Sequence, residues 1–361
     1  MNTPTNYKMI GLMSGTSGDG LDIAYCEFHY DGNWTFDIPA YQTAPFPEKM
    51  AKKLRKSHKL NGYKLSLLDI EFGRWMGMQV RQFINKHQLT VDAVSSHGHT
   101  VFHQPQEKIS LQIGNGWALH QASGLPVIND FRMLDVQLGG QGAPLVPIGD
   151  RLLFGEYDYC INLGGIANIS MESAGQRIAF DICPFNLLLN YFAEYEGLAY
   201  DKNGELAKKG RVLPGVLKNL NKLSYYDIEG HKSLGREDLV GFFEILEGGE
   251  TYKAENILHT LVVHYTEQIK RAMKPIPSKK AKVLITGGGA FNTFFMETLE
   301  EALGEDFQIM PSGETIINFK EALIFAFLGV LKLRDEVNCL SSVTGAKQDN
   351  CGGVLYGQIK S

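Results

Sequence analysis

The stretch from Ser14 to Asp22 gathers the residue types that bind phosphate and a metal ion. It carries glycines at positions 15, 18 and 20, three hydroxyl side chains and two carboxylates. Glycines leave backbone N–H groups open to an anion, and carboxylates such as Asp19 are ligands that magnesium accepts. The stretch therefore predicts a phosphate cradle with a metal anchor, and a plain hairpin with a mobile tip is the alternative.

Two later segments repeat the glycine signal. Within Tyr157–Glu172 the run Asn162-Leu163-Gly164-Gly165 separates two apolar runs, and an apolar run over Lys282–Thr286 leads into three glycines. A strand that runs into glycines and then a helix lets a flat ligand approach the backbone and face a helix N-terminus. The Walker and GxGxxG patterns are absent from the sequence, so P-loop and Rossmann sites lack their fingerprints.

Polar side chains also follow the ends of short apolar runs. His97 follows Ala93–Ser96, Arg132 follows Val127–Asp130, and Asp181 ends the run that starts at Arg177. In α/β sheets ligands bind just beyond the strand ends. We therefore expect these side chains to line a binding site.

The elements that must position these residues are strands alternating with amphipathic helices. Apolar spacing predicts strands around the first hairpin, Met9–Glu27, and helices over Leu65–His87, Glu255–Met273 and Lys320–Lys332. Two glycine hairpins, each opening one half of the chain, indicate an α/β protein with a duplicated domain and a cleft between its halves. The turn-rich segment Leu138–Pro147 is the expected junction, which predicts domains over residues 1–147 and 148–361, with a C-terminal tail able to pack back on the first.

Composition limits the function classes. Of 361 residues, 44% are hydrophobic and 21% charged, values of a soluble globular protein, and the net charge of -5 with no basic stripe disfavours nucleic-acid binding. The sequence shows no signal-peptide core and no membrane-spanning run. Five scattered cysteines without a CxxC pair suit a reducing compartment, so we expect a cytoplasmic protein without membrane or nucleic-acid partners.

The order of hairpin, hairpin and strand–glycine–helix is similar to the two phosphate segments and the adenosine segment of the actin, hexokinase and Hsp70-type ATPase superfamily. Within it, the string MSGTSGDGLD at residues 13–22 resembles the signature of the anhydro-N-acetylmuramic acid kinases. Further strings agree with that family in order along almost the whole chain: Ser96-His97-Gly98-His99-Thr100, Leu111-Gln112-Ile113-Gly114-Asn115, Asp130-Phe131-Arg132, Gly139-Gly140-Gln141-Gly142-Ala143-Pro144-Leu145-Val146-Pro147, Asn162-Leu163-Gly164-Gly165-Ile166-Ala167-Asn168, Gly235-Arg236-Glu237, Gly287-Gly288-Gly289-Ala290-Phe291-Asn292, Glu321-Ala322 and Val343-Thr344-Gly345-Ala346.

This resemblance implies two ribonuclease-H-like domains that close on ATP and Mg²⁺. It implies an enzyme of cell-wall recycling that opens the 1,6-anhydro bridge of its sugar with water while it phosphorylates O6, and it suggests a homodimer. Asp181 would be the base that activates the water, and Asp19 would face Mg²⁺ through a water molecule. The implied nucleotide-binding residues are Gly15, Thr16, Ser17, Gly18, Asp19, Gly20, Leu21, Asp22, Asn162, Gly164, Gly165, Asn168, Gly287, Gly288, Gly289 and Asn292. The implied sugar-binding residues are Ser14, His97, Thr100, Gln112, Arg132, Asp181, Asn186 and Glu321.

One departure from the family pattern keeps other functions open. Around Asp181 the family string is close to DTGPGN, whereas this chain reads Asp181-Ile182-Cys183-Pro184-Phe185-Asn186, with both glycines replaced. The carboxylate is kept, so the reaction class should be kept too. A kinase of the same superfamily for a different sugar, or an ATPase-only regulator, are the alternatives.

Overall fold

The structure, a computed structural model, describes residues 5–14, 20–228, 230, 232–235, 238–247 and 252–359. The chain divides into two compact units: unit 1 runs to Leu153 and resumes at Phe319, and unit 2 is Phe154–Asn318. The expected junction lay six residues earlier, and the expected second domain ran to residue 361 with a C-terminal tail able to pack back on the first domain. The structure assigns the whole segment after residue 318 to unit 1. That segment belongs to unit 1 because its last strand adds to the sheet of unit 1 and its helix packs on that sheet.

The central sheet of unit 1 has the strand order β13-β7-β4-β1-β2-β3. β1 and β2 form the predicted antiparallel hairpin, β3 extends it, and β4 and β7 run parallel to β1. The strands of this unit, which include a separate two-stranded sheet of β5 and β6, are β1 (Asn6–Ser14), β2 (Gly20–Tyr30), β3 (Trp34–Pro45), β4 (Ala93–Ser96), β5 (His99–Gln104), β6 (Ile109–Ile113), β7 (Val127–Asn129) and β13 (Val354–Tyr356).

The sheet of unit 2 repeats this arrangement in the order β10-β9-β8-β11-β12. β8, β9 and β10 are antiparallel neighbours, and β11 and β12 run parallel to β8. Its strands are β8 (Tyr159–Leu163), β9 (Ala167–Ser173), β10 (Gln176–Cys183), β11 (Ala281–Thr286) and β12 (Phe307–Met310). Three antiparallel strands followed by two parallel ones, in the same order in each unit, confirm the predicted α/β fold with two ribonuclease-H-like domains.

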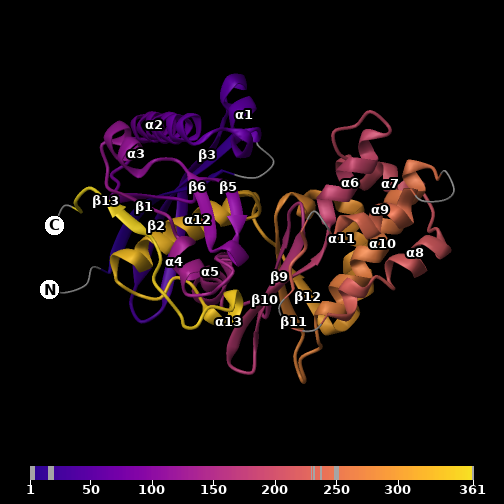
Figure 1. The fold of residues 1–361 in the computed structure, drawn as a ribbon. Helices are drawn as coiled ribbons and strands as arrows, with labels where there is room; N and C mark the ends of the chain where they lie inside the picture. Colours follow the sequence, from indigo (N-terminus) through magenta and orange to yellow (C-terminus); the bar gives the residue numbers. More distant parts are fainter. Residues whose placement is uncertain are drawn as a thin grey trace. The chain divides into compact units, whose positions relative to one another are not determined.

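Helices cover these sheets, and in Figure 1 α2 and α3 lie side by side in unit 1, as α10 and α11 do in unit 2. The helices of unit 1 are α1 (Glu48–Arg55), α2 (Gly62–His87), α3 (Gly116–Ser123), α4 (Met133–Gln137), α5 (Val146–Leu153) and α13 (Ser341–Thr344), with short 3₁₀ turns η1 (Ser57–Lys59) and η2 (Pro105–Glu107). Those of unit 2 are α6 (Phe185–Glu194), α7 (Glu205–Lys209), α8 (Pro214–Leu220), α9 (Leu239–Glu247), α10 (Ala254–Ala272) and α11 (Thr293–Leu303), with η3 (Lys202–Gly204), η4 (Ser224–Asp227), η5 (Gly288–Phe291) and η6 (Gly304–Asp306). The boundary between the units falls within α12 (Glu314–Leu333).

Local sequence explains where several of these helices begin. α2, α3 and α11 each follow an asparagine, and the side-chain oxygens of Asn61, Asn115 and Asn292 accept hydrogen bonds from backbone N–H groups of the first turn. Such caps satisfy N–H groups that have no partner within the helix. The caps therefore set the N-terminus of each helix at the residue after the asparagine.

The apolar helix α12 is almost completely buried from Ala322 to Leu331. A helix that is apolar on all sides belongs inside a core. Its backbone lies so close to β1 that a Cβ atom on Gly11 would stand 1.9 Å from the carbonyl oxygen of Ala322. Glycine at position 11 thus permits the contact that joins the C-terminal segment to the first hairpin.

Candidate active site

Four polar residues form a row across the sheet of unit 2. Strand pairing sets Asp181 of β10 opposite Asn168 of β9, Asn168 opposite Asn162 of β8, and Asn162 beside Thr286 of β11. Directly paired residues project from the same face of a sheet. Tertiary structure thus brings together three predicted site residues, Asp181, Asn168 and Asn162, that stand up to 19 positions apart (181 − 162) in the sequence.

Asp181 is held by the segment that lies against the edge strand β10. Its Oδ2 atom accepts a hydrogen bond from the Leu234 N–H at 2.9 Å, its own N–H donates to the carbonyl of Lys232, and the Tyr225 hydroxyl donates to its carbonyl. Burial raises the pKa of the Asp181 carboxyl, and the Leu234 N–H opposes that shift. A carboxylate with a raised pKa is a better proton acceptor at neutral pH.

The expected position of Asp181 at the end of a strand was wrong. β10 continues to Cys183, and the register with β9 shifts between Asp181 and Cys183. Such an irregularity bends a strand and redirects the side chain beside it. The segment from Asp181 to Asn186, in which this chain departs from the family string, therefore begins within β10 and not after it.

The glycine segment closes tightly on the second hairpin. Gly287 has φ +83°, and a Cβ atom there would lie 2.6 Å from the Asn162 side-chain oxygen. At Gly289 a Cβ atom would lie 2.3 Å from the Phe185 ring, whereas at Gly288 it would meet nothing within 4 Å. Gly287 and Gly289 are therefore required for packing, and Gly288 leaves open space for a ligand.

A cavity of about 410 Å³ adjoins this open glycine. Four predicted residues line it together with Tyr200 and Asp201, namely Asn186, Gly288, Gly289 and Asn292. Asn186 is fixed there because its side chain donates to the Leu163 carbonyl and its N–H donates to Gly164. The cavity lies next to the 3₁₀ turn η5, and its lining combines polar and apolar side chains. Of the other predicted residues of this unit, Gly165 contributes its carbonyl to the Leu187 N–H.

In unit 1 the predicted sugar-contacting residues pair with one another. The Arg132 guanidinium donates from Nε and Nη2 to the Nε2 atom of His97, at 3.1 and 2.8 Å, and from Nη1 to the Gly142 carbonyl. His97 in turn donates from Nδ1 to the Gly98 carbonyl. Burial holds the pKa of His97 well below its usual range, and the positive charge of Arg132 lowers it further, so this imidazole is neutral. Burial lowers the pKa of Arg132 to about 10.

The other predicted residues of unit 1 lie around the ends of β1 and β5. The buried Ser14 hydroxyl lies 3.2 Å from Nδ1 of His99, and the Gln112 amide donates to Thr100 at 3.4 Å. Burial raises the pKa of the Glu321 carboxyl, the positive charges of Lys320 and Arg132 oppose that rise, and the carboxylate of Asp22 adds to it.

The first hairpin, which the sequence predicts to bind phosphate, is only partly described. Gly15, Thr16, Ser17, Gly18 and Asp19 lie outside the described residues. Gly20 packs against the backbone of β3, and the Leu21 side chain is fully buried in the core, so only its backbone could meet a nucleotide. Asp22 accepts a hydrogen bond from Thr43 at 2.6 Å, and burial raises the pKa of its carboxyl.

A cavity of about 190 Å³ in unit 1 contains polar atoms without partners. His97, Gln112, Asn129 and Asp130 are among its lining residues. Among the described residues, the side-chain oxygens of Gln112 and Asn129 are buried and accept no hydrogen bond. A buried acceptor without a donor costs about 1–3 kcal/mol. These two oxygens are therefore suited to accept hydrogen bonds from hydroxyl or amide groups of a ligand.

Comparisons with known proteins bear on the whole chain. The sequence model of the family described as "Anhydro-N-acetylmuramic acid kinase" matches residues 7–358. A protein of that name from Actinobacillus pleuropneumoniae serotype 3 is 32% identical over 98% of this chain and 99% of its own, and one from Francisella tularensis subsp. novicida is 33% identical over the same shares.

The chain belongs to the anhydro-N-acetylmuramic acid kinase family. It is thus a kinase, an enzyme that uses ATP. Among solved structures, the activator of the 2-hydroxyisocaproyl-CoA dehydratase from Clostridium difficile with bound ADPNP is 13% identical at a TM-score of 0.43, covering 91% of this chain and 97% of that one. A ROK family glucokinase from Streptomyces griseus is also 13% identical, at a TM-score of 0.37, covering 89% and 98%.

For a member of this family, sequence reasoning missed several residues that surround the predicted ones. Tyr225 and Leu234 bind Asp181, Tyr200 lines the cavity beside Gly288, and Asn129 lines the cavity of unit 1. None stands in a string that signals chemistry, and Leu234 follows Asp181 by 53 residues.

Within the described residues, no helix is long and apolar enough to cross a membrane.

Proposed function

We propose that this family member phosphorylates 1,6-anhydro-N-acetylmuramic acid on O6 and opens the anhydro bridge with water, giving N-acetylmuramic acid 6-phosphate in cell-wall recycling. The observation that carries the proposal is Asp181, a carboxylate with a raised pKa that shares one face of the sheet with Asn168 and Asn162. Its placement suits a base, because Oδ2 is anchored by one N–H while the carboxylate stays partly exposed.

In this mechanism Asp181 takes the proton of a water molecule as the water oxygen bonds to the anomeric carbon. The bond from that carbon to O6 breaks, and O6 attacks the γ-phosphorus of ATP as the bond to the ADP oxygen breaks. General-base assistance of this kind contributes about 10²–10⁴-fold to a rate. The residue that accepts the proton is therefore the residue whose loss should cost most turnover.

The remaining predicted residues bind and orient the two substrates. Asn162, Asn168, Gly164, Gly165 and the glycine segment would bind the nucleotide, while Ser14, His97, Thr100, Gln112 and Glu321 would contact the sugar. Asn186, expected from the sequence to contact the sugar, lines the cavity beside Gly288 and would instead border the nucleotide. Arg132 would offer the sugar carboxylate the N–H groups that His97 and Gly142 leave free. Mg²⁺, held by Asp19 through water, would neutralise charge on the phosphates.

Purified protein incubated with ATP, Mg²⁺ and the anhydro sugar, with N-acetylmuramic acid and with ordinary hexoses, tests the assignment. Turnover of the anhydro sugar and ¹⁸O from labelled water on C1 of the product are the expected results. Phosphorylation of another sugar instead would favour the different-sugar kinase, and ATP hydrolysis with none of these sugars phosphorylated would favour the regulator. An unlabelled product would reject attack by water.

We further propose a cytoplasmic homodimer. The five cysteines are all free thiols, which suits a reducing compartment, and the dimer rests on the family resemblance. Light scattering on the purified protein checks the dimer, and a monomeric mass at micromolar concentration would reject it.

A further inference from the structure

A second cavity in unit 2, of about 600 Å³, lies on the side of β10 formed by alternate apolar residues. Ile178, Phe180 and Ile182 of β10 form one wall, and Tyr226 of η4 and Arg271 of α10 stand opposite. It shares no lining residue with the cavity beside Gly288. Its volume lies within the range of about 300–1,000 Å³ that small-molecule sites occupy.

The charge of this cavity is opposite to that of the chain. Among the described lining residues, Lys232, Arg271 and Lys274 carry three positive charges against the one negative charge of Asp227, a surplus of two (3 − 1), whereas the whole chain carries -5. Local charge of one sign in a concave site with apolar walls concentrates counter-charged ligands. The cavity is thus suited to an anion.

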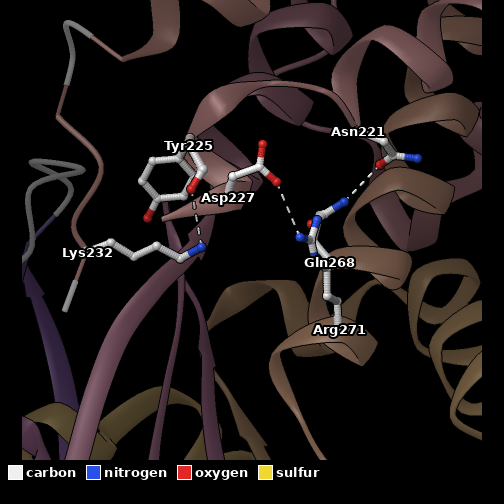
Figure 2. Close-up of polar contacts among 6 residues, drawn as sticks. All are labelled: Asn221, Tyr225, Asp227, Lys232, Gln268 and Arg271. Carbon is white, nitrogen blue, oxygen red and sulfur yellow. Dashed lines mark hydrogen bonds and ion pairs between the residues drawn. The ribbon is translucent and has the colours of Figure 1, made fainter. Parts of the chain in front are cut away.

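The positive groups are weakly engaged among the described residues. Figure 2 shows Lys232 reaching the Tyr225 carbonyl, with Nζ at 3.4 Å, and Arg271 reaching Asp227 at 3.5 Å. The Arg271–Asp227 pair is more than half exposed on both sides, and exposed pairs of this kind contribute little. Both cations can therefore turn to a stronger acceptor without losing a strong partner.

Aromatic rings hold the Lys232 ammonium in place. Nζ lies 4.7 Å from the ring centre of Tyr225 and 5.8 and 5.9 Å from those of Phe180 and Tyr226. Cations are attracted to ring faces at such distances. The rings keep the ammonium close to the apolar wall, where a ligand with an apolar face and a negative group would meet both.

We propose that this cavity binds a phosphate monoester whose body presents an aromatic or apolar face. A phosphate monoester carries a charge of about −1.5 to −2 at pH 7, which matches the surplus of two better than a carboxylate does. Arg271 and Lys232 contact the phosphate oxygens, and the ligand body packs on Phe180 and Ile182.

The same segment that supplies Lys232 also holds Asp181. The Lys232 carbonyl accepts the Asp181 N–H at 3.0 Å, and the Tyr225 hydroxyl donates to the Asp181 carbonyl at 2.7 Å. A ligand that draws the ammonium away from the Tyr225 carbonyl loosens this support. Ligand binding is therefore expected to lower kcat, an expectation that rests on the proposed role of Asp181.

Calorimetric titration of the full chain with phenyl phosphate, in saturating ADP, tests the binding. Phenyl phosphate should bind one site, inorganic phosphate about tenfold more weakly, and phenol not measurably. Lys232→Met and Arg271→Gln should each weaken binding by about tenfold, the loss of one charge-assisted contact. Lys232→Arg keeps the charge and Lys49→Met removes an exposed lysine of α1 in unit 1, so both should stay within threefold.

Three results would overturn the site: no binding of phenyl phosphate at millimolar concentration, wild-type affinity in both Lys232→Met and Arg271→Gln, or binding only when ADP is absent, which would place the ligand in the nucleotide cavity. Thermal melting of each variant guards against misfolding. For the coupling, phenyl phosphate should lower kcat at saturating ATP and sugar in the wild type, and about tenfold more of it should be needed for the same effect in Arg271→Gln. An unchanged wild-type kcat under bound ligand would reject the coupling, and the binding titration does not depend on any turnover.

Discussion

Replacement of Asp181 by asparagine separates the proposed chemistry from the fold. Asparagine has the same shape, and its side-chain oxygen can still accept the Leu234 N–H that now binds Oδ2 at 2.9 Å. The backbone bonds to Lys232 and Tyr225 do not involve the side chain. We therefore expect the variant to fold and to bind ATP as the wild type does.

The expected loss lies in turnover. Removing a general base costs about 10²–10⁴-fold in rate, which corresponds to about 2.7–5.4 kcal/mol of activation free energy at 1.36 kcal/mol per tenfold. ADP release measured by a coupled assay reports the rate, and nucleotide titration reports ATP affinity. Asp306→Asn, which removes an exposed carboxylate in η6, is the matched control and should keep full activity.

The same substitution should reduce turnover without reducing the stability of the fold. Because burial raises the pKa of Asp181 in the folded state, the folded protein binds more protons than the unfolded chain between the ordinary carboxyl pKa and the raised one. This carboxyl therefore lowers the free energy of unfolding as pH rises through that window. At pH 7 the asparagine variant should melt no lower than the wild type.

Three results would refute this reasoning. Equal loss of ATP affinity would place Asp181 in the nucleotide site, and turnover within threefold of wild type would deny it the role of base. A lower melting temperature at pH 7 would contradict the stated stabilising effect of removing the buried charge.

Three further predictions follow from buried polar contacts. Arg132→Met removes both donors to Nε2 of His97 and the second cause of its low pKa, so that pKa should rise in an NMR titration; an unchanged value would mean that burial alone sets it. Lys320→Met breaks a 2.7 Å ion pair with Asp150 in which both side chains are at most 5% exposed, and should lower the free energy of unfolding by about 3–5 kcal/mol in urea; a change below 1 kcal/mol would contradict this. Asn292→Ala removes the cap of α11 and should cost about 1 kcal/mol while raising the KM for ATP, and an unchanged KM would exclude Asn292 from the nucleotide site.

Sequence alone determined the local features of this protein and its family. Periodicity predicts the helix over Leu65–His87 to within three residues of α2, because one apolar face at helical spacing is a local signal. The glycine and hydroxyl strings indicated three nucleotide segments, because binding phosphate demands particular residue types close together in the chain. The family resemblance followed from the same strings, and the comparisons confirm it.

Tertiary structure decided what local patterns do not encode. Strand register places Asp181, Asn168 and Asn162 in one row, and no local pattern specifies which strands pair. The pairing of β13 with β7 moved the C-terminal segment into unit 1, because a strand of three residues gives almost no periodic signal. The support of Asp181 by Leu234 likewise depends on residues that are distant in sequence and meet only because the fold buries the apolar faces between them.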